Sequence, residues 1–511
     1  MDLDLKQIFN KNLLLLIGGF LILEILSVTA FYVSFLSWPI FLILVSSAGV
    51  LTWLKTENGA YILIADLIMS GLGYWFFLDL GDFRLPIRLA IFASVMLIWL
   101  IKLFFRLKER ADIKERFNLI RKLFFNDPKI ILLLFFSIFF ILAISIGLIY
   151  GRGLKALFQD SNNYLYLLAI LLFMSVKLDI NKLLKVFLAG TYALALKTGL
   201  TLISLAYASG TFNFYLYKWI RDTRIGEMTA IFPPLYRVFF QSHLYNLSAL
   251  LIILSILFLT RTSTKYKVIL GLSAWLNFWV VLISGSRSFW LAMFFSCGLL
   301  FLYLIIDNFK NLIRLKLFRR LLLTLKQPLI LGVFLFSCLV AGQLFTNIVL
   351  NDYQFSLLFS RVGSEHNLSE GGNEAGVNSR RDQFLPLVNE IKKSPLWGRG
   401  FAKTVTYFNS DPRISGNYTT SAFELAYLDM WLKFGIIGLF FYLFFIFEVA
   451  TETLSASSDR KYLFFGMLII FALLLINVFT PYLNHPLGIG LILMIVGVNS
   501  KKSTNNLRSA S

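Results

Sequence analysis

Arginine is the residue type whose placement in this chain most strongly suggests chemistry. Six arginines lie between residues 287 and 413 outside the basic run at 310–326: Arg287, Arg361, Arg380, Arg381, Arg399 and Arg413. Three more lie in the aromatic-rich stretch 207–242: Arg221, Arg224 and Arg237. A guanidinium keeps its charge and presents planar paired donors that fit phosphate oxygens. The set predicts an anionic partner, and several converging arginines would hold a diphosphate without a metal.

Candidate proton acceptors are fewer. Glu424 lies where the chain re-enters apolar sequence, three residues before Tyr427. A carboxylate at such a low-dielectric boundary can accept a proton near neutral pH. The alternative is a helix N-terminal acid that the helix dipole stabilises. Asp382 is either a second candidate base or an orienting partner of an arginine, and His366 is the third candidate.

The sequence predicts neither a metal nor a nucleotide cofactor. It has two cysteines, Cys297 and Cys338, both within apolar runs and without a CxxC spacing. The acidic DxD pattern occurs only at Asp2-Leu3-Asp4, and there is no glycine-rich phosphate loop. Nucleotide-sugar and ATP chemistry are therefore not expected.

Composition indicates that these residues lie on a membrane scaffold. The 511 residues are 58% hydrophobic and 16% aromatic, with a mean hydropathy of +0.75. A membrane-spanning helix needs roughly 20 apolar residues. We therefore expect an all-α polytopic bundle of about fourteen spans with a large outer loop that contains short helices. The candidates are 13–33, 38–54, 60–79, 86–105, 129–149, 163–176, 183–206, 243–260, 268–284, 288–306, 328–346, 427–447, 462–480 and 486–499.

The distribution of positive charge orients this scaffold. If both termini are cytoplasmic, the richest basic runs, such as those at 106–128 and 307–327, all fall inside, as the positive-inside rule requires. Topology then accounts for most of the net charge of +20, and nucleic acid is not an expected partner. The predicted organisation is a bundle at 1–346 with an outer loop at 207–242, a large outer loop at 347–426, and C-terminal spans and tail at 427–511.

The residue patterns of both outer segments, 207–242 and 347–426, predict local structure. In the stretch 207–242, aromatics and cations predict short helices along the membrane interface. In the large loop, apolar residues at helical spacing predict an amphipathic helix from Phe384 to Ile391, stopped by Pro395 and Gly398. Outward aromatics of this loop can stack on sugars: Trp397, Phe401, Tyr407 and Tyr418. Within the spans, Glu24, Asp66 and Lys197 are either functional or paired within the bundle.

Several of these segments together resemble a known family. The stretch SGSRSFWLA, the large loop with Arg380-Arg381-Asp382 and SPLWGRGF, and Glu424 followed by Tyr427-Leu428 and Gly435-Ile436-Ile437-Gly438 are similar to the O-antigen ligase and O-antigen polymerase superfamily. The resemblance covers residues 281–443. Ligases of this family carry a histidine where this chain has Glu424, a departure that favours the polymerase branch.

The resemblance implies a glycosyltransferase of the bacterial inner membrane that needs no metal and polymerises undecaprenyl-diphosphate-linked repeat units at the periplasmic face. Donor and acceptor glycans, the bilayer, a chain-length regulator and a flippase are the implied partners. The arginines 221, 224, 237, 287, 380 and 381 would hold the diphosphate, and Glu424, Asp382 or His366 would accept the proton. The alternatives are an O-antigen ligase, a flippase or transporter for the same lipid-linked sugar, and a scaffold of an assembly machine.

Overall fold

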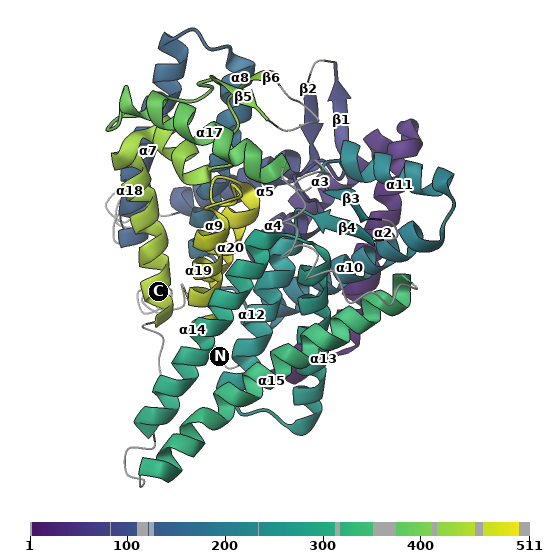
Figure 1. Cartoon of the computed structure of the whole chain (residues 1–511). Coiled ribbons are helices and arrows are strands. Elements are labelled where there is room, and N and C mark those ends of the chain that lie inside the picture. Colours follow the sequence, from purple (N-terminus) through teal and green to yellow (C-terminus); the bar gives the residue numbers. More distant parts are fainter. Residues whose placement is uncertain are drawn as a thin grey trace. The chain divides into compact units, whose positions relative to one another are not determined.

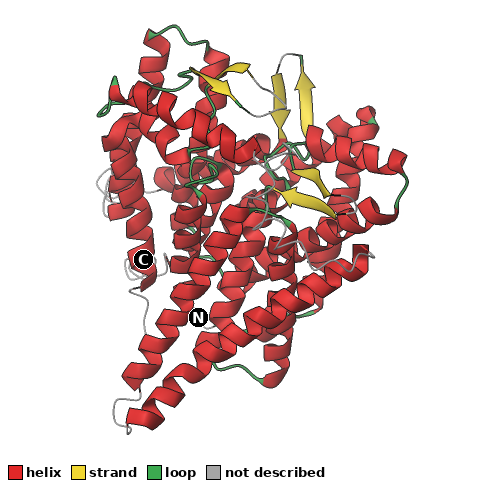
Figure 2. Cartoon of the chain, viewed as in Figure 1, coloured by secondary structure: helices red, strands yellow, loops and turns green. Residues whose placement is uncertain are grey.

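The computed structural model describes residues 3–81, 83–109, 121, 127–232, 235–311, 317–350, 375–410, 416–454 and 463–499. Helices dominate, with three two-stranded antiparallel sheets (Figure 2). The chain forms two compact units: unit 1 comprises residues 1–98, 178–358 and 454–472, and unit 2 comprises residues 99–177, 359–453 and 473–511. The predicted boundaries at 346 and 426 concern membrane topology and stay a prediction.

Within the described residues, nine helices are long and apolar enough to cross a membrane, and three shorter helices are also apolar. The prediction of an all-α polytopic membrane protein is confirmed, but the expected fourteen continuous spans are not all present. The segment 60–79 is helical only to Met69, because Gly71 and Gly73 then take positive φ angles of 53° and 97°. The segment 163–176 begins as a 3-10 helix and continues as a seven-residue α-helix, too short to span.

Unit 1 is a helical bundle that carries two β-hairpins (Figure 1). Long helix α10 packs against α2 and α4, α12 packs against α13, and α14 packs against α15. The elements in chain order are α1 (Leu5–Ile8), α2 (Lys11–Tyr32), η1 (Ser34–Leu36), α3 (Ser37–Leu54), α4 (Thr56–Met69), β1 (Phe77–Leu80), β2 (Phe83–Pro86), α10 (Ile180–Tyr207), α11 (Gly210–Asp222), β3 (Gly226–Phe232), β4 (Leu235–Phe240), α12 (His243–Leu259), α13 (Thr264–Ile283), α14 (Arg287–Asn311) and α15 (Leu317–Leu350).

The stretch 207–242 is only partly helical. Residues Gly210–Asp222 form helix α11, and its position at the membrane interface stays a prediction, but β3 and β4 then form an antiparallel hairpin in which Gly226 faces Phe240. An ideal Cβ at Gly226 would lie 2.5 Å from the Phe239 carbonyl oxygen, so this pairing needs glycine. The prediction of short helices throughout this stretch was therefore wrong, because β-branched and aromatic residues there pair as strands.

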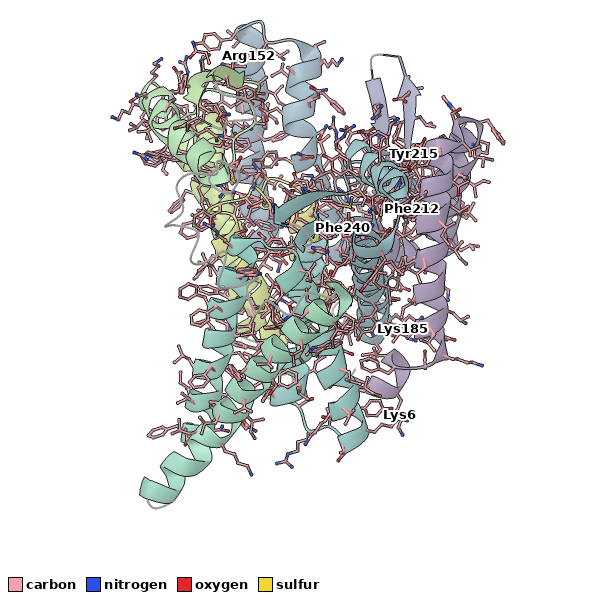
Figure 3. All side chains as sticks on the ribbon, turned by 45° about the vertical axis from the view of Figure 1, so that its right-hand side comes forward. Lys6, Arg152, Lys185, Phe212, Tyr215 and Phe240 are labelled. Atoms are coloured by element: carbon pink, nitrogen blue, oxygen red, sulfur yellow. The ribbon has the colours of Figure 1, made fainter. Side chains whose placement is uncertain are left out.

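The intramembrane charges of unit 1 are paired with one another. Lys197 Nζ lies 2.6 Å from Glu24 Oε1, and the Trp75 indole donates to the other carboxylate oxygen at 3.0 Å. Lys197 Nζ also lies 4.5 Å from the ring centre of Phe240, a residue labelled in Figure 3. Asp66 pairs with Arg88 at 3.0 Å. Of the two readings of these residues, the contacts favour bundle partners.

Unit 2 combines apolar helices with a polar cap, which we define as residues 375–410 and 416–425. Its elements are α7 (Pro128–Ile149), α8 (Leu154–Ser161), η2 (Asn162–Leu168), α9 (Ala169–Ser175), α17 (Ala375–Lys392), β5 (Val405–Asn409), β6 (Gly416–Thr420), α18 (Ala426–Leu454) and α20 (Pro486–Asn499). Helices α5 (Ile87–Glu109) and α19 (Phe465–Ile476) each contain a boundary between the units.

The cap packs on α18 through an apolar core. Leu387, Ile391, Val405 and Phe423 of the cap are buried together with Leu432 of α18, while Phe384 and Leu385 on α17 are exposed. The amphipathic helix expected here is confirmed. The prediction of outward aromatics was wrong for Phe401 and Tyr407, which are buried; Trp397 and Tyr418 are exposed.

A glycine-rich turn joins the cap to the apolar helices. At Gly435, α18 leaves helical geometry with a φ of 71°, and the Ile436 N–H donates to the Pro395 carbonyl at 2.9 Å. The Arg399 N–H donates to the Leu432 carbonyl at 2.6 Å, and the Phe401 N–H donates to the Ala143 carbonyl of α7 at 3.1 Å. The turn at 394–401 is thus hydrogen-bonded by backbone to two helices.

Replacing Lys197 by Met should destabilise the protein by about 3–5 kcal/mol, because Glu24 would remain buried without a counter-charge. The double variant Glu24→Gln/Lys197→Met should recover most of the loss. Thermal unfolding in detergent measures this, with Lys182→Met, an exposed position on the same helix, as the control. An unchanged unfolding temperature for Lys197→Met would contradict the pairing.

Replacing Gly435 by Ala should cost about 3 kcal/mol or more, since a side chain there would meet the Leu396 carbonyl and force a left-handed residue. The matched control is Gly332→Ala in α15, where an added Cβ meets open space. This control should be neutral or slightly stabilising. Equal unfolding temperatures for both variants would show that the turn does not depend on close backbone approach.

Candidate active site

The cap brings together two residues that the sequence singled out, Arg380 and Glu424. Arg380 lies on α17, and Glu424 lies between β6 and α18, two residues before the first residue of α18. Arg380 Nε is 2.9 Å from Glu424 Oε2, with 31% of the arginine side chain and 41% of the glutamate side chain exposed. Because both side chains are half-exposed, the pair is accessible to a substrate at the surface of unit 2.

Gln383, one turn further along α17, fixes the backbone around this pair. Its buried amide donates to Ser379 Oγ and to the Tyr407 hydroxyl, both at 3.0 Å, and its carbonyl accepts the Glu424 N–H at 3.1 Å. One side chain thus connects α17, β5 and the start of α18. Partial burial raises the pKa of Tyr407, so its phenol is a neutral hydrogen-bonding group.

The neighbouring cap residues have different surroundings. Asp382 accepts hydrogen bonds from the backbone N–H of Ser410, at 2.8 Å, and from the Ser410 hydroxyl. It therefore holds the chain that leaves β5. Arg381 is exposed. His366 lies outside the described residues.

Unit 1 places Arg237 beside the turn that carries Arg287. Arg237 Nε donates to the Ser284 carbonyl at 2.8 Å, three residues before Arg287. Gly285 takes a φ of 57° in this turn, and Arg287 is the first residue of α14, with an exposed side chain. Backbone N–H groups at a helix start favour anions. These two cations therefore lie at one end of unit 1.

Arg221 and Arg224 lie in the same stretch as Arg237. Arg221 pairs with neighbouring Asp222 at 2.8 Å on the surface. Arg224 has a left-handed backbone with a φ of 53°, and its guanidinium lies 4.8 Å from the ring centre of Tyr74. Convergence of any unit 1 arginine with Arg380 and Arg381, which belong to unit 2, stays a prediction.

The sequence reading overlooked a buried charged network around Lys433 of α18. Lys433 Nζ lies 2.6 Å from Asp160 of α8 and 2.8 Å from Asp429, and Asn484 donates to Asp429 at 3.1 Å. Asp160 also accepts the Ala402 N–H at 2.7 Å, so the network reaches the glycine-rich turn. Asp429 and Lys433 are four residues apart in an apolar helix, a spacing typical of a pair on one helix face.

Among the residues that the structure describes, no group of three or more His, Cys, Asp and Glu side chains is arranged to hold a metal ion.

The comparisons with known proteins agree with the sequence motifs. The family model described as O-antigen ligase matches residues 272–443, from within α13 to within α18. No curated protein and no solved structure matches the chain. The matched range includes Arg287, the cap with Arg380 and Glu424, and the Gly435 kink. Residues 272–443 therefore carry the domain of the O-antigen ligase and polymerase superfamily, as the sequence resemblance predicted.

Proposed function

We propose that this multi-pass membrane enzyme polymerises undecaprenyl-diphosphate-linked oligosaccharide repeat units at the periplasmic face of the bacterial inner membrane. The family domain supports glycosyl transfer from lipid-linked sugars in general. The observation that carries the proposal is the half-exposed ion pair of Arg380 with Glu424, a cation beside a carboxylate at the start of a membrane helix. Transfer from a lipid diphosphate needs these two functions: a counter-charge for the leaving group and a proton acceptor.

In the proposed reaction, a hydroxyl oxygen of the acceptor sugar attacks the anomeric carbon of the donor glycan. The new glycosidic C–O bond forms as the bond between that carbon and the diphosphate oxygen breaks. The hydroxyl proton passes to Glu424, and the diphosphate leaves with the electron pair of the broken bond. Fixed cations stabilise the charge that builds on this leaving group.

In this scheme Arg380 interacts both with Glu424 and with the diphosphate leaving group. A guanidinium has five N–H donors, and in Arg380 the Nε atom lies 2.9 Å from Glu424 Oε2 as an ion pair without a hydrogen bond. The other guanidinium donors are of the kind that binds phosphate oxygens. Arg381, exposed at the next position, adds a second cation to the same end of α17.

Glu424 is a better-supported base than Asp382. Asp382 accepts two hydrogen bonds from Ser410 and thereby holds the cap loop, whereas Glu424 lies at the boundary between the cap and the apolar helix α18. His366 remains an alternative. The carboxylate at position 424, where ligases of this family have a histidine, is the reason to favour polymerase over ligase.

Arg287 is proposed to hold the donor diphosphate together with the N-terminus of α14, supported by Arg237 and by Arg221 and Arg224 of the same stretch. This assignment requires both termini to be cytoplasmic, so that the turn at 284–287 faces the periplasm. The internal pairing of Glu24 with Lys197 and of Asp66 with Arg88 argues against the alternative of a transporter with open charged groups at mid-membrane.

Replacing Glu424 by Gln should reduce polymer formation by about 10²–10⁴-fold, because the amide cannot accept the proton. Gel analysis of glycan chain length in a deletion strain complemented with the variant measures this. The control is Asp79→Asn, since Asp79 also pairs with an arginine, Arg84, but on an exposed hairpin. Wild-type chain length for Glu424→Gln would exclude Glu424 as the base.

Replacing Arg287 by Ala should abolish long-chain glycan, with a loss of about 10²–10³-fold or more, while the protein still inserts in the membrane. Arg84→Ala removes a comparable surface charge and should leave chain length unchanged. Accumulation of single lipid-linked repeats identifies a polymerase, whereas accumulation of unattached lipid-linked polymer identifies a ligase. Retained polymer would remove Arg287 from the mechanism.

A further inference from the structure

Unit 2 contains a second group of cations, separate from the Arg380–Glu424 pair. Two of its members lie beside the exposed ring of Tyr150, whose centre is 5.3 Å from the Arg152 guanidinium carbon and 5.7 Å from that of Arg399. Arg152, labelled in Figure 3, lies just beyond the end of α7. Lys403 approaches the same region through Glu390. We call Tyr150, Arg152, Glu390, Arg399 and Lys403 the Tyr150 cluster.

The backbone holds this cluster in place. Arg152 Nη1 donates to the carbonyl of Gly400 at 3.1 Å and to that of Phe401 at 2.6 Å. Gly400 has a φ of 75°, and an ideal Cβ there would lie 2.6 Å from the Ala143 carbonyl oxygen. Arg399 immediately precedes this glycine. Both guanidiniums are therefore positioned by the turn that joins the cap to α7.

Positive charge in the cluster exceeds the negative charge available to balance it. Glu390 is shared by Lys393, by Lys403 at 3.3 Å and by Arg399 at 3.9 Å. Arg399 Nε is buried and has no hydrogen-bond acceptor. The nearby carboxylate Asp160 pairs with Lys433 at 2.6 Å. Glu390 thus faces the positive charges of Lys393, Lys403 and Arg399. The negative charge of Asp160, which shares Lys433 with Asp429, also acts on Arg152.

The pKa shifts of Arg152 and Glu390 also indicate an excess of positive charge in the cluster. Burial lowers the pKa of Arg152, and the neighbouring charge of Arg399 lowers it further. Partial burial raises the pKa of Glu390, but hydrogen bonds from Lys393 and Lys403 outweigh that effect, so that this pKa falls below its ordinary value. An anion bound between the two guanidiniums would offset their repulsion.

The position of the cluster indicates that the anion is carried by a lipid. Tyr150 and Arg152 directly follow Ile149, the last residue of an apolar helix long enough to cross a membrane. Tyr is enriched at this boundary, where lipid phosphates lie, and a long cationic side chain can extend to its polar region. Along α17, ten residues separate Arg380 from Glu390, which corresponds to about 15 Å at the helical rise.

We propose that the Tyr150 cluster binds the diphosphate of the second lipid-linked substrate, the glycan acceptor. The inference rests on the proposed function. Polymerisation joins two substrates that each carry a lipid diphosphate, and the acceptor keeps its own diphosphate throughout the reaction. That group lies a repeat unit away from the attacking hydroxyl, so a polymerase needs a second anion site at a distance from its base.

The test measures how many lipid diphosphates the full-length protein binds. Native mass spectrometry of the protein in neutral-lipid nanodiscs, titrated with undecaprenyl diphosphate, should show two bound equivalents. Arg399→Gln/Lys403→Gln should weaken one equivalent by about tenfold or more, as expected for lost charge-assisted hydrogen bonds. Arg380→Gln/Arg381→Gln should weaken the other, and all four substitutions together should remove both.

The control variant is Lys11→Gln/Lys182→Gln, which removes two exposed charges in unit 1 and should still bind two equivalents. A single equivalent in the wild type, or two in Arg399→Gln/Lys403→Gln, would overturn the inference. So would an equal effect of that variant on phosphatidylglycerol, which would indicate a general phospholipid site. The polymerase proposal is judged separately, by the glycan produced with Glu424→Gln.

Discussion

Close backbone approach between the turn at 394–401 and two apolar helices underlies the architecture of unit 2. The Pro395 carbonyl and the Arg399 N–H pair with backbone groups on either side of the kink at Gly435, and the Phe401 N–H donates to the Ala143 carbonyl of α7. Unsatisfied backbone groups are costly in a membrane. The turn therefore satisfies the polar backbone of α18 at its kink, and it can approach this closely because Gly398, Gly400 and Gly435 lack side chains.

The same turn links the charged groups of unit 2. The Asp160 carboxylate accepts a hydrogen bond from the backbone N–H of Ala402 and forms an ion pair with Lys433. This buried ion pair therefore positions Ala402, the residue just after the turn. Arg152 also holds the turn in place, because its Nη1 donates to the carbonyls of Gly400 and Phe401. Candidate chemistry at Glu424 thus lies on a cap whose attachment to the membrane helices is specified by backbone and buried charge.

Some of this could be predicted from the sequence. The alternation of apolar residues at helical spacing from Phe384 to Ile391 predicted α17, and the stop at Pro395 and Gly398 is where the chain turns. Composition predicted the membrane class. The motif at 394–401 and at 435–438 carried the resemblance to the family, and the structure gives the physical reason that these two short stretches occur together.

Other features could not be predicted. The pairing of Arg380 with Glu424 joins residues 44 positions apart through a hairpin that hydropathy does not reveal. Lys433 and Asp160 are 273 positions apart, so their pairing depends on tertiary packing alone. The hairpin β3–β4 was mistaken for interfacial helix because aromatic and β-branched residues serve both environments. We expected Phe401 and Tyr407 to be exposed and to stack on sugars. The sequence of a polar loop does not indicate which of its aromatic side chains are buried in a core.

Helix α17 carries Arg380 near its first residue and Glu390 near its last. A hydrogen-bonded helix is a stiff object whose length is set by covalent geometry, whereas the separation of two headgroups in a fluid bilayer fluctuates with thickness and lateral motion. Both ends of this helix are held, by Glu424 at one and by the cations around Glu390 at the other. The distance between the two clusters of charge is thereby set by the helix and not by the thickness or lateral motion of the surrounding lipids.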